Sequence, residues 1–415
     1  MNKLLLLMVG FHILAGCSGG GGGGADAAGA GDPFPDGAAA YSPVMSGNNV
    51  LPLQVTTAGY LNEPVVSVVI CNPGTNGTGS CVTVNNILLD TGSSGLRVFN
   101  SKLTGLNLTQ VTNVGGNQLA NCTKYADGTA HWGPVKTADV VLGGEIVSSV
   151  NIQVLNDQYA DATPCGTPEV DNGSAGYNGI LGVGIRDQDC GANCVATTVN
   201  GKYYSCAGSS NGSACTDSLA TLAMQVRNPV AAITAASNSD GIADNNGTVL
   251  ILPSVPSTGA VTASGYLIFG INTRANNTPA GGTKVIATDS QGLFVTNFNG
   301  QNLTSFIDSG SNGLFFPKTS STPLCYGDWY CPSSTLTLQA THKPFGGGTS
   351  YAVTFEVANA GSIFSSNNYA LSNLSAVFTG YFDWGLGFFY GRSVYTSING
   401  KGASVNGVSA PFYAY

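Results

Sequence analysis

Two segments of the chain repeat one pattern of residues that could perform acid–base chemistry. Residues 90–99 read Asp-Thr-Gly-Ser-Ser-Gly-Leu-Arg-Val-Phe, and residues 308–317 read Asp-Ser-Gly-Ser-Asn-Gly-Leu-Phe-Phe-Pro. Each segment follows an apolar run, so each places an Asp on a turn that ends a buried strand. The two aspartates, Asp90 and Asp308, stand 218 positions apart. This spacing suggests a single site that two lobes build together.

A single copy of this pattern would indicate an ordinary turn, because Asp and Ser side chains bond nearby backbone amides and Gly accepts positive φ. Duplication with the same apolar flanks changes that interpretation. A carboxylate at the end of a hydrophobic strand is costly to desolvate unless donors or a shared proton compensate it. Building such a carboxylate twice indicates that Asp90 and Asp308 serve chemistry.

The elements that must position these aspartates are predicted to be short strands. Gly occupies 58 of 415 positions, Ser, Thr, Asn and Val are plentiful, and helical charge patterns are few, which favours an all-β fold. A chain of this length can hold two domains. Charged residues make up only 9% of the chain, against about 25% in typical soluble domains. Hydroxyl and amide side chains must therefore carry the surface, as is common in exported proteins.

The two repeated segments resemble the paired active-site loops of pepsin-like aspartic peptidases. Residues 179–184 (Gly-Ile-Leu-Gly-Val-Gly) and residues 384–389 (Trp-Gly-Leu-Gly-Phe-Phe) resemble the glycine-rich strand that this family threads behind each loop. Residues 265–271 resemble the segment that closes the first lobe of the family fold. The resemblance spans about residues 46–415, and its motifs are specific around the two loops.

The resemblance implies a bilobal fold with the active site between the lobes. Residues 46–272 would form an N-terminal β lobe with the Asp90 loop and a flap, and residues 273–415 a C-terminal β lobe with the Asp308 loop. In such a fold the two aspartates share a water and hold one proton, because two adjacent carboxyls do not both ionise readily. One carboxyl then acts as base toward the water and the other as acid toward the scissile carbonyl. The assignment of these two roles stays open.

By resemblance, three pairs of neighbours support the aspartates. The hydroxyls of Thr91 and Ser309 should cross-link the two loops. The amides of Gly92 and Gly310 should approach the carboxyls. The hydroxyls of Ser93 and Ser311 should bond the outer oxygens of the carboxyls.

A flap hairpin is expected at residues 125–133, before an alternating strand at residues 138–142. Tyr125 resembles the flap tyrosine of the family, and Trp132 is the alternative for that position. Arg97 stands where the family usually has a Trp that hydrogen-bonds the flap tyrosine. Arg97 could stack on one of these two rings, raise the local positive potential and favour ionised aspartates, or face solvent.

The N-terminus predicts export. The apolar run at residues 4–14 is too short to span a bilayer and indicates a signal peptide at residues 1–16. It ends in Leu-Ala-Gly-Cys, which resembles a bacterial lipobox whose cysteine, here Cys17, is diacylated. Residues 17–45 would form the lipidated cysteine and a glycine-rich tether. These features predict a lipid-anchored protein of the bacterial cell envelope, at the outer membrane.

The ten cysteines other than Cys17 are compatible with five disulfides in an oxidising compartment. Close spacing favours a disulfide between Cys71 and Cys81 and another between Cys325 and Cys331. The other six cysteines allow fifteen pairings, among which the sequence does not choose. They are Cys122, Cys165, Cys190, Cys194, Cys206 and Cys215.

Charge and motif content disfavour other classes of function. The net charge of −8 leaves no electrostatic footprint for nucleic acid. No cofactor and no metal is implied: a CxxC pair is absent, and residues 238–244, which resemble a calcium loop, lack its acidic twelfth position. A serine hydrolase is not supported either, because neither His131 nor His342 lies in a recognisable triad context. The sequence predicts a monomer that takes a peptide or protein substrate and meets the membrane through its lipid.

Three functions are compatible with these residues. The first is an envelope-anchored aspartic endopeptidase that hydrolyses peptide bonds with a water activated by Asp90 and Asp308. The second is a catalytically silent pepsin-fold lipoprotein that binds a peptide or partner, for which Arg97 and the uncertain flap are the grounds. The third is a structural or adhesive β protein in which the motifs are turns. Retention of both aspartates and both supporting serines favours the first function.

Overall fold

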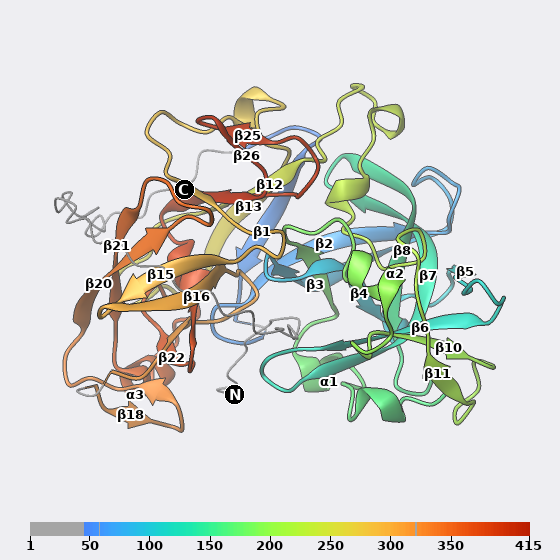
Figure 1. The fold of residues 1–415 in the computed structure, drawn as a ribbon, viewed down its shortest axis with the longest axis horizontal. Coiled ribbons are helices and arrows are strands. Elements are labelled where there is room, and N and C mark those ends of the chain that lie inside the picture. Colours follow the sequence, from blue (N-terminus) through green and yellow to red (C-terminus); the bar gives the residue numbers. More distant parts are fainter. Residues whose placement is uncertain (1–44, 58, 320–321) are drawn as a thin grey trace.

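Figure 1 shows the computed structural model of the chain, which describes residues 45–415 except residues 58, 320 and 321. The predicted signal peptide, Cys17 and the predicted tether up to residue 44 lie outside the described residues. Strands dominate and the helices are short, so the prediction of an all-β fold is confirmed. No helix among the described residues is long and apolar enough to cross a membrane.

The larger sheet has 16 strands among the described residues. In hydrogen-bonded order these are β11 (Cys215–Asp217), β10 (Tyr203–Cys206), β6 (Gln118–Lys124), β7 (Ala130–Leu142), β8 (Glu145–Leu155), β4 (Ser94–Phe99), β9 (Gly179–Val183), β3 (Cys81–Asp90), β2 (Pro64–Cys71), β1 (Val50–Val55), β13 (Ala263–Phe269), β12 (Gly247–Leu252), β24 (Arg392–Ser397), β27 (Phe412–Ala414) and β14 (Val285–Ala287), with β5 (Thr109–Gln110) beside β7.

The second sheet has nine strands in the described part of the chain. In order they are β18 (Leu324–Cys325), β19 (Trp329–Tyr330), β22 (Ser375–Val377), β17 (Leu314–Phe316), β23 (Tyr381–Trp384), β16 (Gln301–Ile307), β15 (Phe294–Phe298), β20 (Leu336–Lys343) and β21 (Tyr351–Val357). A separate hairpin consists of β25 (Ser404–Val405) and β26 (Val408–Ser409). The α-helices are α1 (Asn172–Ala175), α2 (Ala192–Ala196) and α3 (Ala360–Phe364), and short 3₁₀ turns cover residues 100–102, 163–165, 230–232, 235–237, 275–277 and 386–388.

Figure 1 shows the strands in two groups side by side, with β1, β12 and β13 running between them. Three strands that follow the predicted boundary at residue 273, namely β14, β24 and β27, extend the larger sheet rather than the second one. The larger sheet therefore joins the two predicted segments of the chain.

Burial patterns explain which strands form the outside of the molecule and which form its centre. In β20 the sequence Leu-Thr-Leu-Gln-Ala-Thr-His-Lys alternates between more and less buried positions, as expected for a strand with one solvated face. β4, β9 and β17 are buried along their whole length, as expected for strands covered on both faces. β4 and β17 follow the two aspartates in the chain, and β9 pairs with the strand that ends at Asp90.

The same three-strand arrangement occurs once in each sheet. In the larger sheet β9 lies between β3, its parallel neighbour, and β4, its antiparallel neighbour. In the second sheet β23 lies between β16 and β17 with the same two directions. In both sheets the central strand comes later in the chain than its two neighbours. One neighbour is the strand that leads to the Asp, and the other is the strand that follows the Asp. The two repeated sequence segments therefore occupy equivalent places.

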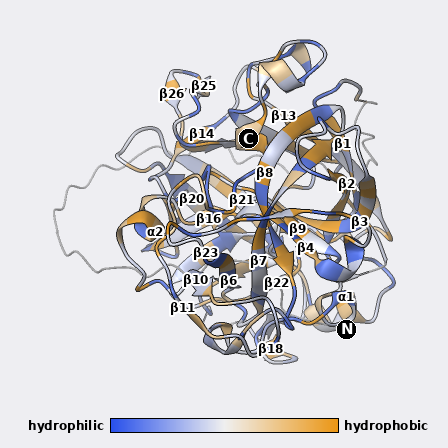
Figure 2. Cartoon of the chain, turned by 90° about the vertical axis from the view of Figure 1, so that its right-hand side faces the viewer, coloured by the Kyte–Doolittle hydropathy of each residue, from blue (hydrophilic) through white to orange (hydrophobic). Residues whose placement is uncertain are grey.

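One apolar cluster connects the two arrangements. It includes Leu89 and Leu181 from the larger sheet and Ile307 and Trp384 from the second sheet, all fully buried. Figure 2 shows hydrophobic residues along interior strands such as β1 and β13. Burial of this shared core holds the ends of β3 and β16 near each other.

The described part of the chain contains five disulfides. Two of them are the predicted pairs, Cys71–Cys81 and Cys325–Cys331. The other six cysteines pair as Cys122–Cys165, Cys190–Cys194 and Cys206–Cys215. Cys206 and Cys215 are opposite each other in the register of β10 and β11, so the strand pairing explains that disulfide.

Candidate active site

The two aspartates stand where their strands end. Asp90 is the last residue of β3, and Asp308 follows the last residue of β16. Both carboxyls are buried. Because β3 and β16 are held by equivalent neighbours, the loops that follow them turn in the same way.

Each loop binds its own carboxyl through equivalent donors. The Gly92 amide donates to Asp90 Oδ1 at 2.7 Å, and the Gly310 amide donates to Asp308 Oδ1 at 2.7 Å. The Ser93 hydroxyl donates to Asp90 Oδ2, as the Ser311 hydroxyl does to Asp308 Oδ2 at 2.9 Å. These contacts are the ones expected for the glycine and serine pairs.

The loops also reach each other's carboxyl. The Gly92 amide donates a second hydrogen bond, of 3.1 Å, to Asp308 Oδ1. The Oδ1 atoms of Asp90 and Asp308 are therefore no farther apart than these two bonds laid end to end, about 5.8 Å. The charge of Asp90 therefore acts directly on the pKa of Asp308. The two aspartates thus form one carboxyl pair.

Glycine is required on both sides of this carboxyl pair. A Cβ atom on Gly92 would lie 2.5 Å from Asp308 Cγ, and a Cβ atom on Gly310 would lie 2.8 Å from Asp90 Oδ1. Both separations are shorter than a normal contact, so any other residue would push the carboxyls apart.

Hydroxyl groups cross-link the two loops, as expected. The Ser309 amide donates to Thr91 Oγ1 at 2.9 Å, and the Thr91 amide donates to Ser309 Oγ at 3.1 Å. The Thr91 hydroxyl then donates to the Ile307 carbonyl and the Ser309 hydroxyl to the Leu89 carbonyl. Each loop is thereby tied to the strand that carries the opposite Asp.

Burial dominates the electrostatics of the pair. It raises the pKa of Asp90, and hydrogen bonds from Ser93, Asp308 and Gly92 and the charge of Arg97 oppose this rise. Burial also raises the pKa of Asp308 well above its usual range, and the negative charge of Asp90 raises that pKa further. The pair therefore retains a proton at a pH where an ordinary Asp is ionised, which provides an acid and a base side by side.

Tyr125 lies at the turn of the hairpin formed by β6 and β7, and its side chain is buried. Burial raises the pKa of its hydroxyl, and the charges of Arg97 and Asp90 act on it from nearby. The Tyr125 hydroxyl hydrogen-bonds His131 Nδ1 at 3.1 Å. Trp132 instead donates to the Tyr159 carbonyl and packs edge-on against Tyr204 in a separate apolar cluster.

Arg97 is buried, so the solvent-facing alternative is wrong. Its guanidinium forms an ion pair of 3.1 Å with Asp189 and donates to Thr123 Oγ1 and to the carbonyls of Ser94 and Gly95. The charge of Arg97 lowers the pKa of Asp90, as expected if it raises the local positive potential.

The sequence analysis missed the hydrogen-bond partners around Tyr125 and a third buried carboxyl. His131 Nε2 lies 3.0 Å from Glu169 Oε2, and the Tyr177 hydroxyl bonds both. Asp383 lies on β23 next to the Asp308 loop. Its signal was present in the sequence, because a charged residue interrupts the apolar stretch just before the second glycine-rich segment.

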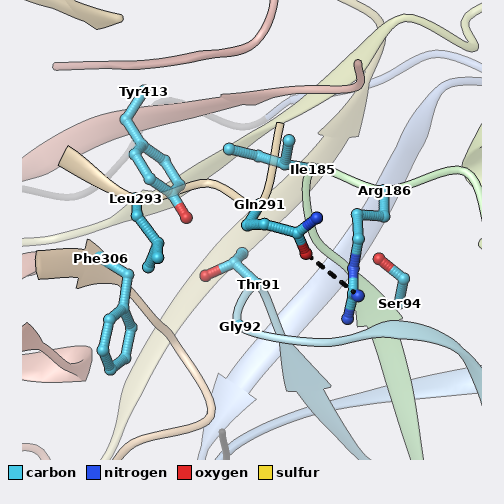
Figure 3. A pocket seen from close by; sticks show the side chains of 9 residues that line it. All are labelled: Thr91, Gly92, Ser94, Ile185, Arg186, Gln291, Leu293, Phe306 and Tyr413. Carbon is cyan, nitrogen blue, oxygen red and sulfur yellow. Dashed lines mark hydrogen bonds between the residues drawn. The ribbon is translucent and has the colours of Figure 1, made fainter. Parts of the chain in front are cut away.

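A small cavity of about 20 Å³ lies beside the first loop and has room for about one water molecule (Figure 3). Arg186 donates to Gln291 Oε1 at 3.4 Å across it. Its lining consists of Thr91, Gly92, Ser94, Ile185, Arg186, Gln291, Leu293, Phe306 and Tyr413.

Comparison with known proteins gives a family but no activity. The family model described as "Protein of unknown function (DUF3443)" matches residues 45–415. A search of curated proteins finds no match. Among solved structures, the aspartic proteinase from Irpex lacteus is similar, with a TM-score of 0.48 and 16% sequence identity over 88% of this chain and 96% of that chain.

Proposed function

The chain belongs to the DUF3443 family of proteins of unknown function, and we propose that it is an aspartic endopeptidase. In this proposal Asp90 and Asp308 activate a water that hydrolyses a peptide bond. One observation carries the proposal: two buried carboxyls from repeated loops both accept a hydrogen bond from the Gly92 amide. Burying two acids against each other carries a desolvation penalty, and a turn with a purely structural role does not require it.

The reaction uses one proton on the pair. The ionised carboxyl takes a proton from water as the water oxygen attacks the carbonyl carbon, and the other carboxyl gives its proton to the carbonyl oxygen. The resulting tetrahedral diol collapses when the pair gives its proton to the amide nitrogen and the C–N bond breaks, while one diol hydroxyl returns its proton to the pair as the new carbonyl forms. The pair ends with one proton, as it began. The roles of acid and base are assigned to the pair rather than to one residue each, because the two carboxyls titrate together.

The surroundings of the pair support a bilobal pepsin-like fold in which the hairpin of β6 and β7 is the flap. Tyr125 suits the flap tyrosine better than Trp132 does, because the charge of Asp90 acts on its hydroxyl whereas Trp132 is bonded elsewhere. We further propose that the chain acts as a monomer anchored to the bacterial envelope, at the outer membrane, through lipid on Cys17. Its substrate would be a peptide or an unfolded protein segment.

One observation favours a second candidate function. Both carboxyls are fully buried, and the Tyr125 hydroxyl is bonded to His131. A substrate would have to displace this arrangement, so a pepsin-fold protein that binds a peptide or partner without cleaving it is the alternative.

Peptide cleavage by the purified mature protein tests the proposal. A broad peptide library should be cleaved with a bell-shaped dependence on pH between about 3 and 8, because the rate needs one proton on the pair. Asp90→Asn and Asp308→Asn should each abolish cleavage while the far-ultraviolet circular dichroism stays unchanged. Asp328→Asn, a change at an exposed Asp, is the matched control and should cleave like the wild type. Absence of cleavage with retained peptide binding would replace the peptidase by the binding protein.

A further inference from the structure

His131 is a fully buried histidine that contacts three polar side chains. It lies near the start of β7, and none of its surface is exposed. On one side of the ring, Nδ1 lies 3.1 Å from the Tyr125 hydroxyl. On the other side, Nε2 lies 3.0 Å from Glu169 Oε2 and 3.2 Å from the Tyr177 hydroxyl. Both ring nitrogens therefore have hydrogen-bond partners.

Glu169 determines which ring nitrogen of His131 carries the hydrogen. A carboxylate can only accept hydrogen bonds, so the hydrogen of a neutral imidazole must be on Nε2, the nitrogen that faces Glu169. The Tyr177 hydroxyl donates to the same carboxylate at 2.9 Å, and its oxygen can accept from Nε2 as well. Nδ1 is then left with a lone pair, so it accepts from the Tyr125 hydroxyl. The contacts at Nε2 thus set the direction of the bond at Nδ1.

The groups that face His131 favour the neutral ring. Burial lowers the pKa of His131 most, and the hydrogen bond and charge of Glu169 oppose this effect. The charges of Arg97 and Asp127 act on the same pKa in opposite directions, with Arg97 lowering it. Burial raises the pKa of both tyrosine hydroxyls that face the ring, so they stay protonated. A neutral ring is the form that can accept at Nδ1.

The hydrogen bonds of His131 connect the hairpin of β6 and β7 to the strands near Asp90. Tyr177 lies two residues before β9, and it packs with Tyr125 and with Leu88 of β3 in one apolar cluster. β9 pairs with β3, the strand that ends at Asp90. Through its two ring nitrogens, His131 therefore links the Tyr125 side chain to the part of the larger sheet that carries Asp90.

We propose that His131 is a positioning residue for the proposed peptidase reaction: with its hydrogen held on Nε2 by Glu169, it accepts the Tyr125 hydroxyl hydrogen at Nδ1 and fixes the proposed flap tyrosine. This inference rests on the proposed function for its effect on cleavage, but not for the form of the ring or its bond to Tyr125. Protonation of His131 would place a hydrogen on Nδ1 and end this acceptor role.

Nitrogen NMR resonances of the His131 ring test the hydrogen-bond assignment whether or not the protein cleaves peptides. At pH 7 they should show a neutral ring with its hydrogen on Nε2, and the Nδ1 resonance should shift in Tyr125→Phe. Glu169→Gln can donate as well as accept, so the other tautomer should become populated. An Nδ1–H tautomer or a charged ring in the wild type would overturn the inference.

His342 is the matched control for these spectra. Its Nδ1 lies 2.9 Å from the Tyr415 hydroxyl, and its Nε2 has no hydrogen-bond partner among the described residues. Its resonances should therefore stay in place in Tyr125→Phe and in Glu169→Gln. A shift of the His342 resonances as large as that of His131 would indicate a general change of the fold and would overturn the local explanation.

Cleavage rates test the effect on the reaction. Tyr125→Phe and His131→Leu should each lower kcat/KM about tenfold, the effect of one lost hydrogen bond, and combining them should add nothing because both remove the same bond. His131→Asn, whose amide oxygen can stand where Nδ1 stands, should recover most of the loss. Tyr415→Phe removes the hydroxyl from the other histidine–tyrosine pair and is the control, which should cleave like the wild type.

Two kinetic results would contradict the positioning role. One is full activity of Tyr125→Phe, a mild change that remains informative if His131→Leu does not fold. The other is a pair of losses that multiply in the double variant, because independent effects combine in that way. A wild type that cleaves nothing, but whose Nδ1 resonance responds to Tyr125→Phe, would reject the peptidase and retain the bond between His131 and Tyr125.

Discussion

Thr91 and Ser309 hold each other's backbone amide through their side-chain oxygens. The two hydrogen bonds, of 2.9 and 3.1 Å, join residues 218 positions apart, and both residues are buried. This reciprocal link joins the two loops directly, and it lies one residue from each aspartate. It explains how two separate segments hold two carboxyls in register.

We expect this link to contribute to stability as well as to geometry. Thr91→Val and Ser309→Ala each leave a buried amide without its acceptor, so each should lower the free energy of unfolding by about 1–3 kcal/mol. Urea denaturation measures this loss. Thr91→Ser retains the hydroxyl and is the control, which should remain within about 1 kcal/mol of the wild type. Equal loss in Thr91→Ser and Thr91→Val would show that packing of the methyl group, rather than the hydrogen bond, is what matters.

Alanine in place of either loop glycine should disrupt the carboxyl pair. In Gly92→Ala the new Cβ would meet Asp308, and in Gly310→Ala it would meet Asp90. We expect each change to lower stability by about 1–3 kcal/mol, as overpacking does, and to abolish peptide cleavage. Gly281→Ala is the matched control, because no atom lies within 4 Å of its Cβ position. Thermal unfolding and cleavage rates of the three variants would contradict this explanation if Gly281→Ala behaved like the other two.

Removal of the Arg97 charge should shift the acid side of the pH profile. Arg97 lowers the pKa of Asp90, so its removal raises that pKa, and the acid limb of kcat/KM should move to higher pH. Arg97→Met also removes the closer ion-pair partner of Asp189, which retains Lys202 at 3.4 Å, and should cost at most about 3–5 kcal/mol. Arg97→Lys keeps the charge and should keep the limb near its wild-type position. The prediction fails if Arg97→Met remains folded and its acid limb is unmoved.

Burial of His131 should make stability fall in acid. Burial lowers the pKa of His131 below 6.5, although Glu169 opposes this effect. Between the lowered pKa and 6.5 the unfolded chain binds more protons than the folded chain. The stability difference is therefore fully present above pH 6.5 and decreases as pH falls through this window, by at most about 1.4 kcal/mol per pH unit.

Comparison of variants isolates this effect from the buried carboxyls, whose raised pKa values act in the opposite direction. His131→Gln should lose less stability than the wild type between pH 7 and pH 5. His342, whose pKa burial holds well below 6.5 on a strand of the second sheet, is the matched position, and His342→Gln should reduce the slope in the same direction. Urea unfolding at the two pH values measures both slopes. An unchanged slope in His131→Gln would mean that His131 is charged in the folded state.

Local patterns in the chain were sufficient for the features that depend on neighbours in sequence. The repeated turn residues after apolar runs identified both aspartates and their glycine and serine neighbours, because strand ends and tight turns are specified within a few residues. The abundance of glycine and of β-forming residues predicted the all-β fold. Cys71–Cys81 and Cys325–Cys331 were identified because the two cysteines of each pair are close in sequence and far from every other cysteine, whereas the other six lie together within residues 122–215.

Long-range packing decided the rest. Which of the fifteen pairings the six remaining cysteines adopt depends on strand neighbours that the spacing does not reveal. The same is true of Arg97, whose partner Asp189 is 92 positions away, and of the extension of the larger sheet by β14, β24 and β27. Asp383 carries a signal in the sequence, but only the register of β23 with β16 and β17 shows that it is enclosed. The chemistry of a buried charge is set by its three-dimensional neighbours, and only the folded chain brings those neighbours together.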